Sequence, residues 1–168
     1  MAKGQAERLL GLVQELMAQA GVTMKDLDAI GVGTGPGNFT GIRICVSAAR
    51  GLALGLGIPA VGVTAFETLH FGTDGPCLCT VDARRDMVFV QGFGTPVFAT
   101  PELVARVDLP PALPLVGAFG AAPAHPVAHA IAQITASRFA SNAAAPAPLY
   151  LRPADAAPAR DLPPRIVP

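Results

Sequence analysis

One stretch constrains the fold more than any other, residues 33–50, which read GTGPGNFTGIRICVSAAR. It follows an apolar run from Ala29 to Val32, places four glycines and a proline within nine residues, and continues as a long apolar segment. Glycine adopts a positive φ without steric cost and proline fixes its own φ, so these residues suit a sharp turn. The stretch therefore predicts a strand, a tight turn and a helix.

A turn of this kind points several backbone N–H groups at one spot, with the positive end of a helix dipole behind them, so an anion could bind there. The stretch contains neither the GxGxxG nor the GxxxxGK[ST] pattern of nucleotide-binding loops. Tight turning and close packing are therefore the favoured explanation for its glycines. A side-chain oxygen of Asn38 or Thr40 is expected to cap the helix. The candidate anion contacts are Gly35, Gly37, Asn38, Thr40, Gly41 and Arg43.

The composition is that of a chain able to bury a core, and 168 residues suffice for one domain or slightly more. Apolar residues make up 51%, and the 12 basic residues balance the 12 acidic ones. This balance argues against a broadly basic nucleic-acid surface, so contact with RNA needs a local patch or a partner. The longest apolar stretch, Gly51 to Val63, is interrupted by Pro59 and is too short to cross a bilayer. We therefore expect a soluble, cytoplasmic protein without a membrane segment.

The cysteines allow a metal site but favour a simpler role. Cys77 and Cys79 form a C-x-C pair inside a predicted strand, where alternation places both on one face, and Cys45 lies in the apolar helix. The sequence offers no further ligand at a suitable spacing, so we interpret the pair as buried core residues in a reducing compartment and expect no metal. His125 and His129 are four residues apart and could pair as ligands, although an exposed helix face explains them as well.

Hydrophobic periodicity predicts two helices of different character in the first half of the chain. The helix over Lys3 to Ala20 is amphipathic. The helix over about Phe39 to Gly55 carries only a narrow polar stripe, so it must be covered on more than one side. These two helices have only two or three strands to pack on, which is few for a sheet.

The remaining elements divide the chain into a first α/β subdomain over 1–70, a second α+β subdomain over 71–145 and a Pro-rich tail over 146–168. Within the second subdomain, Asp82 and Arg84 belong to a charged hairpin loop. The expected elements are a capped turn at 23–26, a strand at 59–63, a helical turn at 64–69, strands at 77–81 and 87–92 around the loop 82–86, a helix starting at Thr100-Pro101-Glu102, a strand at 115–117, a helix at 127–139, and an extended tail ordered only at 149–152.

Four segments carry a family resemblance: AERLLGLVQELMAQAG, LDAIGVGTGPGNFTGIRICVSAARGLALGLGIPAVGVTAFETL, VDARRDMVFV and PLYLRPADAAP. Together they resemble the TsaB/YeaZ family over nearly the whole chain. The resemblance implies an actin-like, Hsp70-like (ASKHA) nucleotidase fold and the role of non-catalytic partner of a related TsaD subunit, in threonylcarbamoyl transfer to tRNA adenosine. It further implies a TsaE-like ATPase as an additional partner, a homodimer when the chain is alone, contact with tRNA only through the complex, and no cofactor of its own, since ATP belongs to the complex.

The chain departs from the family pattern at its start. Family members begin with a strand that bears an acidic residue, and two more strands precede the helix that here starts at Lys3. We therefore expect an N-terminally truncated first subdomain that lacks its first β-meander. Such a chain should be unstable, with apolar helix faces and a sheet edge uncovered. The missing acid is the residue that would handle a nucleotide's metal and phosphate in this fold.

A second departure concerns catalysis. The catalytic relative resembles this chain at Gly62-Val63 and continues with two metal-binding histidines, but residues 65–69 here read AFETL. Glu67 alone cannot hold a transition metal, and His70 is out of register with the missing pair. The chain is therefore not expected to be an enzyme. The alternative is a nucleotide-binding or metallopeptidase-like enzyme that uses the glycine turn and Asp82 as a metal carboxylate. Direct tRNA binding has only arginines such as Arg84 and Arg85 in its favour.

The two helices of the first half are the candidate contact surface for a related subunit or for a second copy. Packing within the chain's own core is an almost equally good explanation for each residue taken singly. The candidate contacts are Leu9, Leu12, Val13, Leu16, Val46, Arg50 and Ala53.

Overall fold

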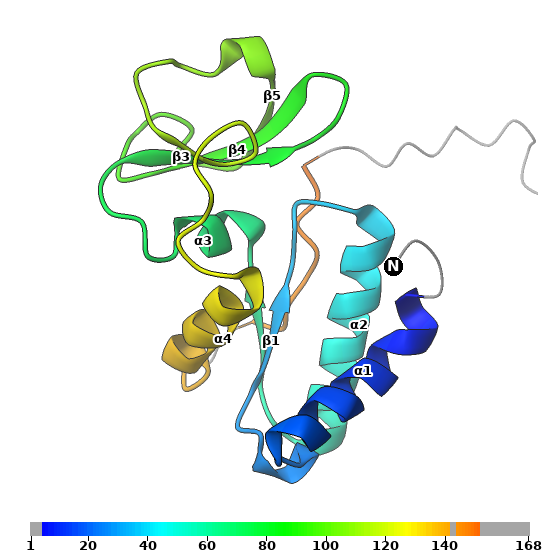
Figure 1. The fold of residues 1–168 in the computed structure, drawn as a ribbon. Helices are drawn as coiled ribbons and strands as arrows, with labels where there is room; N and C mark the ends of the chain where they lie inside the picture. Colours follow the sequence, from blue (N-terminus) through cyan, green and yellow to red (C-terminus); the bar gives the residue numbers. More distant parts are fainter. Residues whose placement is uncertain (1–4, 142–143, 152–168) are drawn as a thin grey trace, which may run out of the picture.

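The computed structural model describes residues 5–141 and 144–151, and it contains two sheets. The helices are α1 (Gln5–Ala20), α2 (Phe39–Leu56), α3 (Ala65–His70) and α4 (Val127–Arg138), with short 3-10 turns at Met24–Asp26 and Arg106–Asp108. The strands are β1 (Ile30–Gly33), β2 (Ala60–Val63), β3 (Cys77–Asp82), β4 (Met87–Phe93), β5 (Glu102–Ala105) and β6 (Leu115–Gly117). Strands β1 and β2 form one sheet, and the other has the order β5-β4-β3-β6 (Figure 1).

The first sheet is a parallel pair joined by α2. Its register runs from Ile30 opposite Ala60 to Gly33 opposite Val63. Two parallel neighbouring strands need a long crossover connection, and α2 provides it. The inner face of α2 packs on the strand pair. Asn38 caps the start of α2, and Gly57 ends it in the left-handed conformation that glycine adopts without strain.

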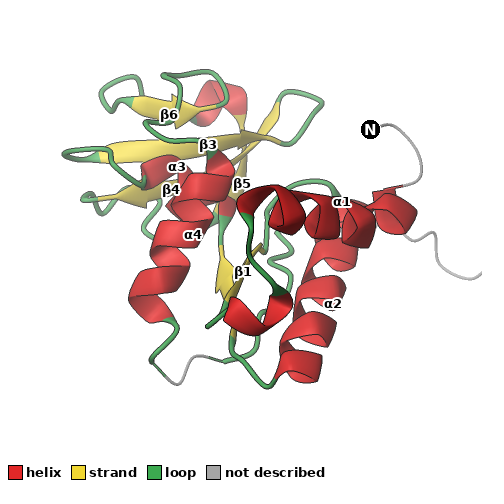
Figure 2. Cartoon of the chain, turned by 60° about the horizontal axis from the view of Figure 1, so that its bottom comes forward, coloured by secondary structure: helices red, strands yellow, loops and turns green. Residues whose placement is uncertain are grey.

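Helix α4 covers the opposite face of the same pair of strands, as both ribbon views show (Figures 1 and 2). Its Ile134 packs against Val61 and Val63. Gly31 permits the close approach, because a Cβ at that position would overlap the side chain of Thr135. We expected this helix in the second subdomain, and the contacts correct that assignment: α4 packs on the first sheet.

The second sheet and α3 enclose the main core. Strands β3 and β4 are antiparallel, whereas β3 and β6 are parallel. Phe66 of α3 is fully buried against this sheet. The buried members of the cluster are Phe66, Cys77, Cys79, Ala83, Phe89 and Val116. The prediction that both cysteines of the C-x-C pair are core residues is therefore confirmed.

One sequence-based expectation about local structure was wrong. Thr100-Pro101-Glu102 does not start a helix, because the segment after Pro101 forms β5 and pairs antiparallel with β4. The long-range ladder outweighs the local preference of proline for a first helical turn. The prediction that the tail is ordered at 149–152 is confirmed at Leu149, whose N–H donates to the Thr34 C=O at 2.8 Å and whose side chain packs against the main core. The start of the expected first helix (residues 3–4) and the tail from residue 152 to 168 lie outside the residues that the structure describes.

Helix α2 needs comment because of its hydropathy. Within residues 5–141 and 144–151 it is the one helix long and apolar enough to cross a membrane by length and composition. Its Val46 and Ala49 pack on Val32 of β1, as the crossover helix of a parallel strand pair does. One helix of this kind is weak evidence for a membrane segment.

An ion pair connects α3 to α4. The Arg138 guanidinium lies 2.6 Å from the Glu67 carboxylate. The same carboxylate accepts from the Thr64 N–H at 2.7 Å and closes a capping box at the start of α3. Partial burial alone would raise the pKa of Glu67, but the hydrogen bonds from Thr64 and Arg138 hold it below its ordinary value.

Replacing Glu67 with Gln should lower the free energy of unfolding by about 1 kcal/mol at neutral pH, because the ion pair is lost and the cap is weakened. The pKa of Glu67 is lower in the folded state than its ordinary value of 4.5. The stabilisation is therefore complete at pH values above 4.5, and it disappears as the pH falls through the folded-state pKa. Urea unfolding at a series of pH values should show the two proteins converging in acid. Arg138→Gln, which keeps the capping box, should lower the free energy of unfolding by less than Glu67→Gln does. A difference between wild type and Glu67→Gln that does not change with pH would contradict the role assigned to the Glu67 carboxylate.

Candidate functional site

The glycine turn lies where the two sheets meet. The Thr34 N–H donates to the Val63 C=O at 2.9 Å, and the Ala65 N–H donates to the Gly35 C=O at 2.8 Å. Gly35 has a φ of +94°, and a Cβ there would lie 2.6 Å from Ile42 Cδ1. Tight turning and close packing are thus confirmed at Gly35. Gly37 is exposed, and a Cβ there would make only an ordinary contact.

Several candidate anion contacts at this turn already have partners inside the chain. The Asn38 Oδ1 accepts from the Gly41 N–H at 2.8 Å, which confirms the predicted cap. The Arg43 Nε donates to the Tyr150 hydroxyl at 2.8 Å, and its guanidinium lies 4.0 Å from the centre of the Phe39 ring. Thr40 is exposed beside them. An anion would have to compete with these contacts, and the anion site stays a prediction.

A cavity of about 430 Å³ opens behind the turn, between the two sheets, α3 and α4. Its lining is mainly apolar, with Thr68, Thr80 and Asp82 as the main polar side chains. The Thr68 hydroxyl donates to the Ala65 C=O at 2.7 Å, and the Thr80 hydroxyl donates to the Ala118 C=O. Among the described lining residues we find no nucleophile paired with a base, so the cavity offers space rather than a recognisable catalytic group.

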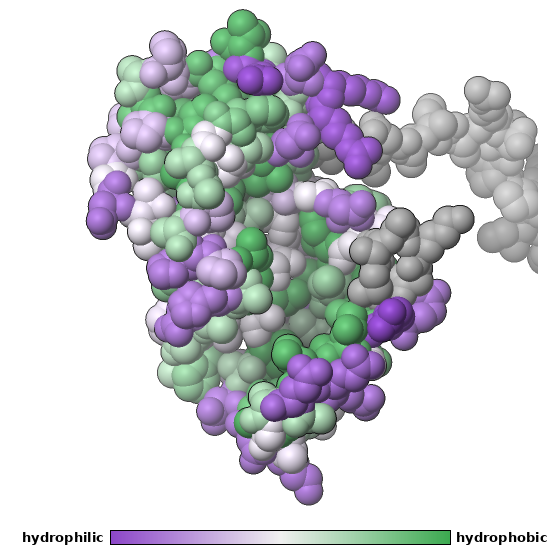
Figure 3. All heavy atoms as spheres, in the orientation of Figure 1, coloured by the Kyte–Doolittle hydropathy of each residue, from purple (hydrophilic) through white to green (hydrophobic). Residues whose placement is uncertain are grey.

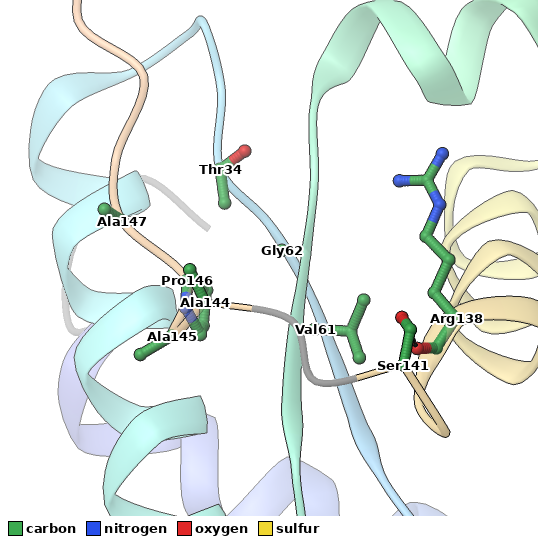
Figure 4. Close-up of a pocket in the computed structure, with 9 residues that line it drawn as sticks. All are labelled: Thr34, Val61, Gly62, Arg138, Ser141, Ala144, Ala145, Pro146 and Ala147. Atoms are coloured by element: carbon green, nitrogen blue, oxygen red, sulfur yellow. Dashed lines mark hydrogen bonds between the residues drawn. The ribbon is translucent and has the colours of Figure 1, made fainter.

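A second pocket of about 290 Å³ lies between the end of α4 and residues 144–147 (Figure 4). Figure 4 shows Arg138 extending from α4 along the strands, with Thr34 on the other side of the opening. The guanidinium of Arg138 is the charged group of this pocket, and it is paired with Glu67. The pocket therefore has little charge left for a ligand.

The charged hairpin loop has an unusual backbone. Arg84, Arg85 and Asp86 have φ values of 61°, 52° and 56°, a left-handed conformation that costs side-chain-bearing residues energy. The Asp82 Oδ1 accepts from the Arg84 N–H at 2.8 Å, so its carboxylate shapes the turn. The Arg106 N–H donates to the Asp86 C=O and fixes the loop against β5. The two exposed arginine side chains are thereby held at the tip of the hairpin.

Helix α1 exposes apolar side chains along its length. Leu10 and Leu12 are exposed, and Leu16 keeps 66% of its surface in solvent. Leu9 and Val13 are half-buried, and no side chain that the structure describes in α1 is fully buried. Both ribbon views place α1 near α2 and at an angle to it, and Figure 3 shows apolar and polar side chains interleaved over this part of the surface. Leu12 and Leu16 are four residues apart and share one helix face, and exposed apolar side chains on one face are typical of a contact surface.

The candidate contacts on α2 need correction. Val46 and Ala53 keep only 3% and 4% of their surface in solvent, because they lie on the helix face that packs on the first sheet. Arg50 is exposed on the outer face, as a contact residue must be. Leu54, which the sequence analysis passed over, is 85% exposed. Its position four residues after Arg50 places it on the same outer face, and that spacing could have identified it.

The structure also brings together a group of possible metal ligands that the sequence did not reveal. His70, at the end of α3, lies beside Cys77 and Cys79 of β3. Burial raises the pKa of the Cys79 thiol, and the neighbouring Cys77 raises it further. His125 precedes α4 instead of lying in it, and its ring is 5.1 Å from that of His129. This second pair packs near Phe71.

Substituting Arg85 by Gly should raise the free energy of unfolding by about 0.5–1 kcal/mol, because glycine adopts the left-handed conformation without strain. Arg50→Gly is the matched control. Arg50 lies within α2, so the same change should lower the free energy of unfolding by about 1 kcal/mol. Urea unfolding measures both, and destabilisation by Arg85→Gly would show that the arginine side chain itself stabilises the loop.

Comparison with known proteins identifies relatives of the chain. Residues 1–97 match the family model described as "TsaD: tRNA N6-adenosine threonylcarbamoyltransferase". A Mycobacterium tuberculosis protein, "Uncharacterized protein Rv3421c", is 37% identical over 94% of this chain and 79% of its own length. The Escherichia coli "tRNA threonylcarbamoyladenosine biosynthesis protein TsaB" is 38% identical over 49% of this chain and 38% of its own length.

A solved structure agrees at the level of the fold. The structure of "YeaZ from Pseudomonas aeruginosa" superposes with a TM-score of 0.65 at 23% identity, and the match covers 88% of this chain and 85% of that one. The chain shares with it the actin-like ASKHA fold, with the two sheets described above. From the family model, the relatives and this shared fold, we conclude that the chain belongs to the TsaB/YeaZ family.

Proposed function

We propose that this chain is the non-catalytic partner of a TsaD-type catalytic subunit in the synthesis of threonylcarbamoyladenosine on tRNA. The observation that carries the proposal is the pair of exposed leucines on one face of α1, Leu12 and Leu16, together with Leu54 on the outer face of α2. The name of the E. coli relative supports the pathway, and the family model named for TsaD supports a related subunit as the partner.

The size of the apolar surface fits a helix-to-helix contact. Full burial of a leucine side chain contributes about 1.5–3 kcal/mol, so the partly exposed Leu12, Leu16 and Leu54 would together supply several kcal/mol. Association has its own entropic cost, and further contacts must offset it. Two helices that present ridges to a second pair of helices provide such contacts by interdigitation. Arg50 lies beside Leu54 on that face and could pair with an acidic group at its rim.

The same surface would also allow a homodimer when the chain is alone, because a two-fold interface uses one patch twice. We assign a TsaE-like ATPase and the use of ATP to the assembled complex. Contact with tRNA belongs to the complex as well, because this chain carries equal numbers of basic and acidic residues. The cytoplasm is the compartment that fits this role.

Leu12→Asp and Leu16→Asp should abolish co-elution with the TsaD-type subunit on size exclusion, because each places a charge in the proposed apolar contact. Leu16 keeps 66% of its surface in solvent, so Leu16→Asp should retain wild-type thermal unfolding, whereas Leu12 keeps 36% and Leu12→Asp should lower the unfolding temperature without preventing folding. Arg50→Glu should weaken co-elution less, since a rim charge contributes modestly.

Val107→Asp is the matched control, because Val107 is 87% exposed and lies next to β5 on the second sheet. This variant should co-elute as the wild type does. Normal co-elution of the folded Leu12→Asp and Leu16→Asp variants would place the interface elsewhere. Self-association lost in the same variants would show that homodimer and heterodimer share the surface.

The isolated chain should hydrolyse ATP no faster than buffer, measured by phosphate release. The reason is that Asn38 and Arg43 are engaged within the chain and that Asp82 holds its own loop. The matched comparison is the mixture with the TsaD-type subunit at the same concentration. Hydrolysis by the pure chain that is lost in Asp82→Asn would instead support the nucleotide-binding enzyme.

A further inference from the structure

Three side chains that commonly ligate metals converge where the end of α3 meets β3. His70 is the last residue of α3, and Cys77 and Cys79 lie on one face of β3. Their ligand atoms all lie within 4.8 Å of one another. The His70 Nδ1 is 3.6 Å from the Cys77 Sγ. Two thiols and one imidazole thus meet at a single point of the fold.

The arrangement is held by packing on several sides. The His70 ring stacks on Phe93, with ring centres 4.3 Å apart and planes only 12° from parallel. Phe93 of β4 pairs with Cys77 of β3 across the ladder, so the residue that supports the imidazole lies directly opposite the one that carries the thiol. Both cysteines are almost fully buried, whereas His70 is partly exposed. The cluster is therefore closed on the sheet side and reached by solvent beside His70.

The distances suit a small tetrahedral ion. Zinc binds sulfur at about 2.3 Å and imidazole nitrogen at about 2.0–2.1 Å, which places tetrahedral nitrogen and sulfur ligands about 3.5 Å apart. The observed distance from Nδ1 to Sγ is 3.6 Å. The widest separation in the cluster is below 4.8 Å, so about 1 Å of side-chain movement would complete the geometry. Rotation about χ1 of one cysteine supplies a movement of this size.

Charge selects among the ions that thiolates bind. Thiolate ligands favour Zn²⁺ and Cu⁺ over Mg²⁺ or Ca²⁺. Two thiolates and a neutral imidazole with Zn²⁺ form a site of zero net charge, whereas Cu⁺ would leave a net negative charge next to an apolar core. We propose that His70, Cys77 and Cys79 form a zinc site, with water from the side of His70 as the fourth ligand. Binding releases one proton from each thiol to solvent.

The site would act on the fold, independently of the proposed pairing with a catalytic subunit. The ion would join the C-terminus of α3 to β3, and α3 follows directly on β2 of the first sheet. It would thereby restrain the segment that borders the 430 Å³ cavity, which includes Thr68 and Leu69. Because zinc would bind the folded chain and not the unfolded one, it would raise the temperature of unfolding.

The test is zinc titration of the whole chain in a thiol-free reductant, with competition by a chromophoric chelator, and Co²⁺ as the spectroscopic probe. We expect one equivalent of zinc, a near-ultraviolet thiolate-to-cobalt band and a raised unfolding temperature. Cys77→Ala and Cys79→Ala should each lower the zinc affinity by more than about 100-fold, and His70→Gln by more than about tenfold.

Cys45→Ser is the matched control, because Cys45 is exposed on α2 and lies outside the cluster. Its zinc affinity and cobalt band should equal those of the wild type. Should a core alanine variant fail to fold, His70→Gln decides, since its side chain is not fully buried. The proposal is overturned if wild type binds zinc no more tightly than His70→Gln, or if the cobalt band depends on Cys45. Tight Cu⁺ binding without zinc binding would overturn the choice of ion.

Discussion

The parallel pairing of β1 with β2 imposes the arrangement of the first half of the chain. Parallel neighbours require a crossover, so the segment between the strands must leave the sheet, cross one of its faces and return. The glycine turn starts that crossover, and α2 completes it with Val46 and Ala49 directed at the strands. Alternation along β1 then turns Gly31 towards the opposite face, where α4 packs. One ladder of strands thus fixes the positions of two helices.

This constraint also separates core from contact surface. Because α2 covers one face of the strand pair and α4 the other, α1 gains no buried side chain among those that the structure describes. Leu10, Leu12 and Leu16 of α1 stay exposed, and so does Leu54 on the outer side of α2. Strand β1 pairs only with β2 among the described residues. Exposed large apolar side chains lie on both halves of the molecule, but Leu12 and Leu16 share one helix face.

The sequence predicted what local patterns control. Periodicity located α1, α2 and the β3–β4 hairpin, and turn chemistry located the Asn38 cap. The sequence did not predict elements whose structure depends on distant segments. Strand β5 depends on pairing with β4, and α4 packs on the first sheet, more than sixty residues away along the chain. The inner and outer faces of α2 could not be separated because both are apolar, so Val46 and Ala53 were misplaced. His70 reaches the cysteines only because α3 docks on β3.

The two readings of function make different demands on the structure. Catalysis at the glycine turn needs free polar groups, yet backbone hydrogen bonds from Thr34 to Val63, from Ala65 to Gly35 and from Leu149 to Thr34 tie three segments together there. The nearby hydroxyls donate to carbonyl groups of the chain itself. A ligand would have to replace contacts that already stabilise the fold, at a cost for each one. A partner that covers the leucines of α1 replaces only water, and this difference favours the binding role.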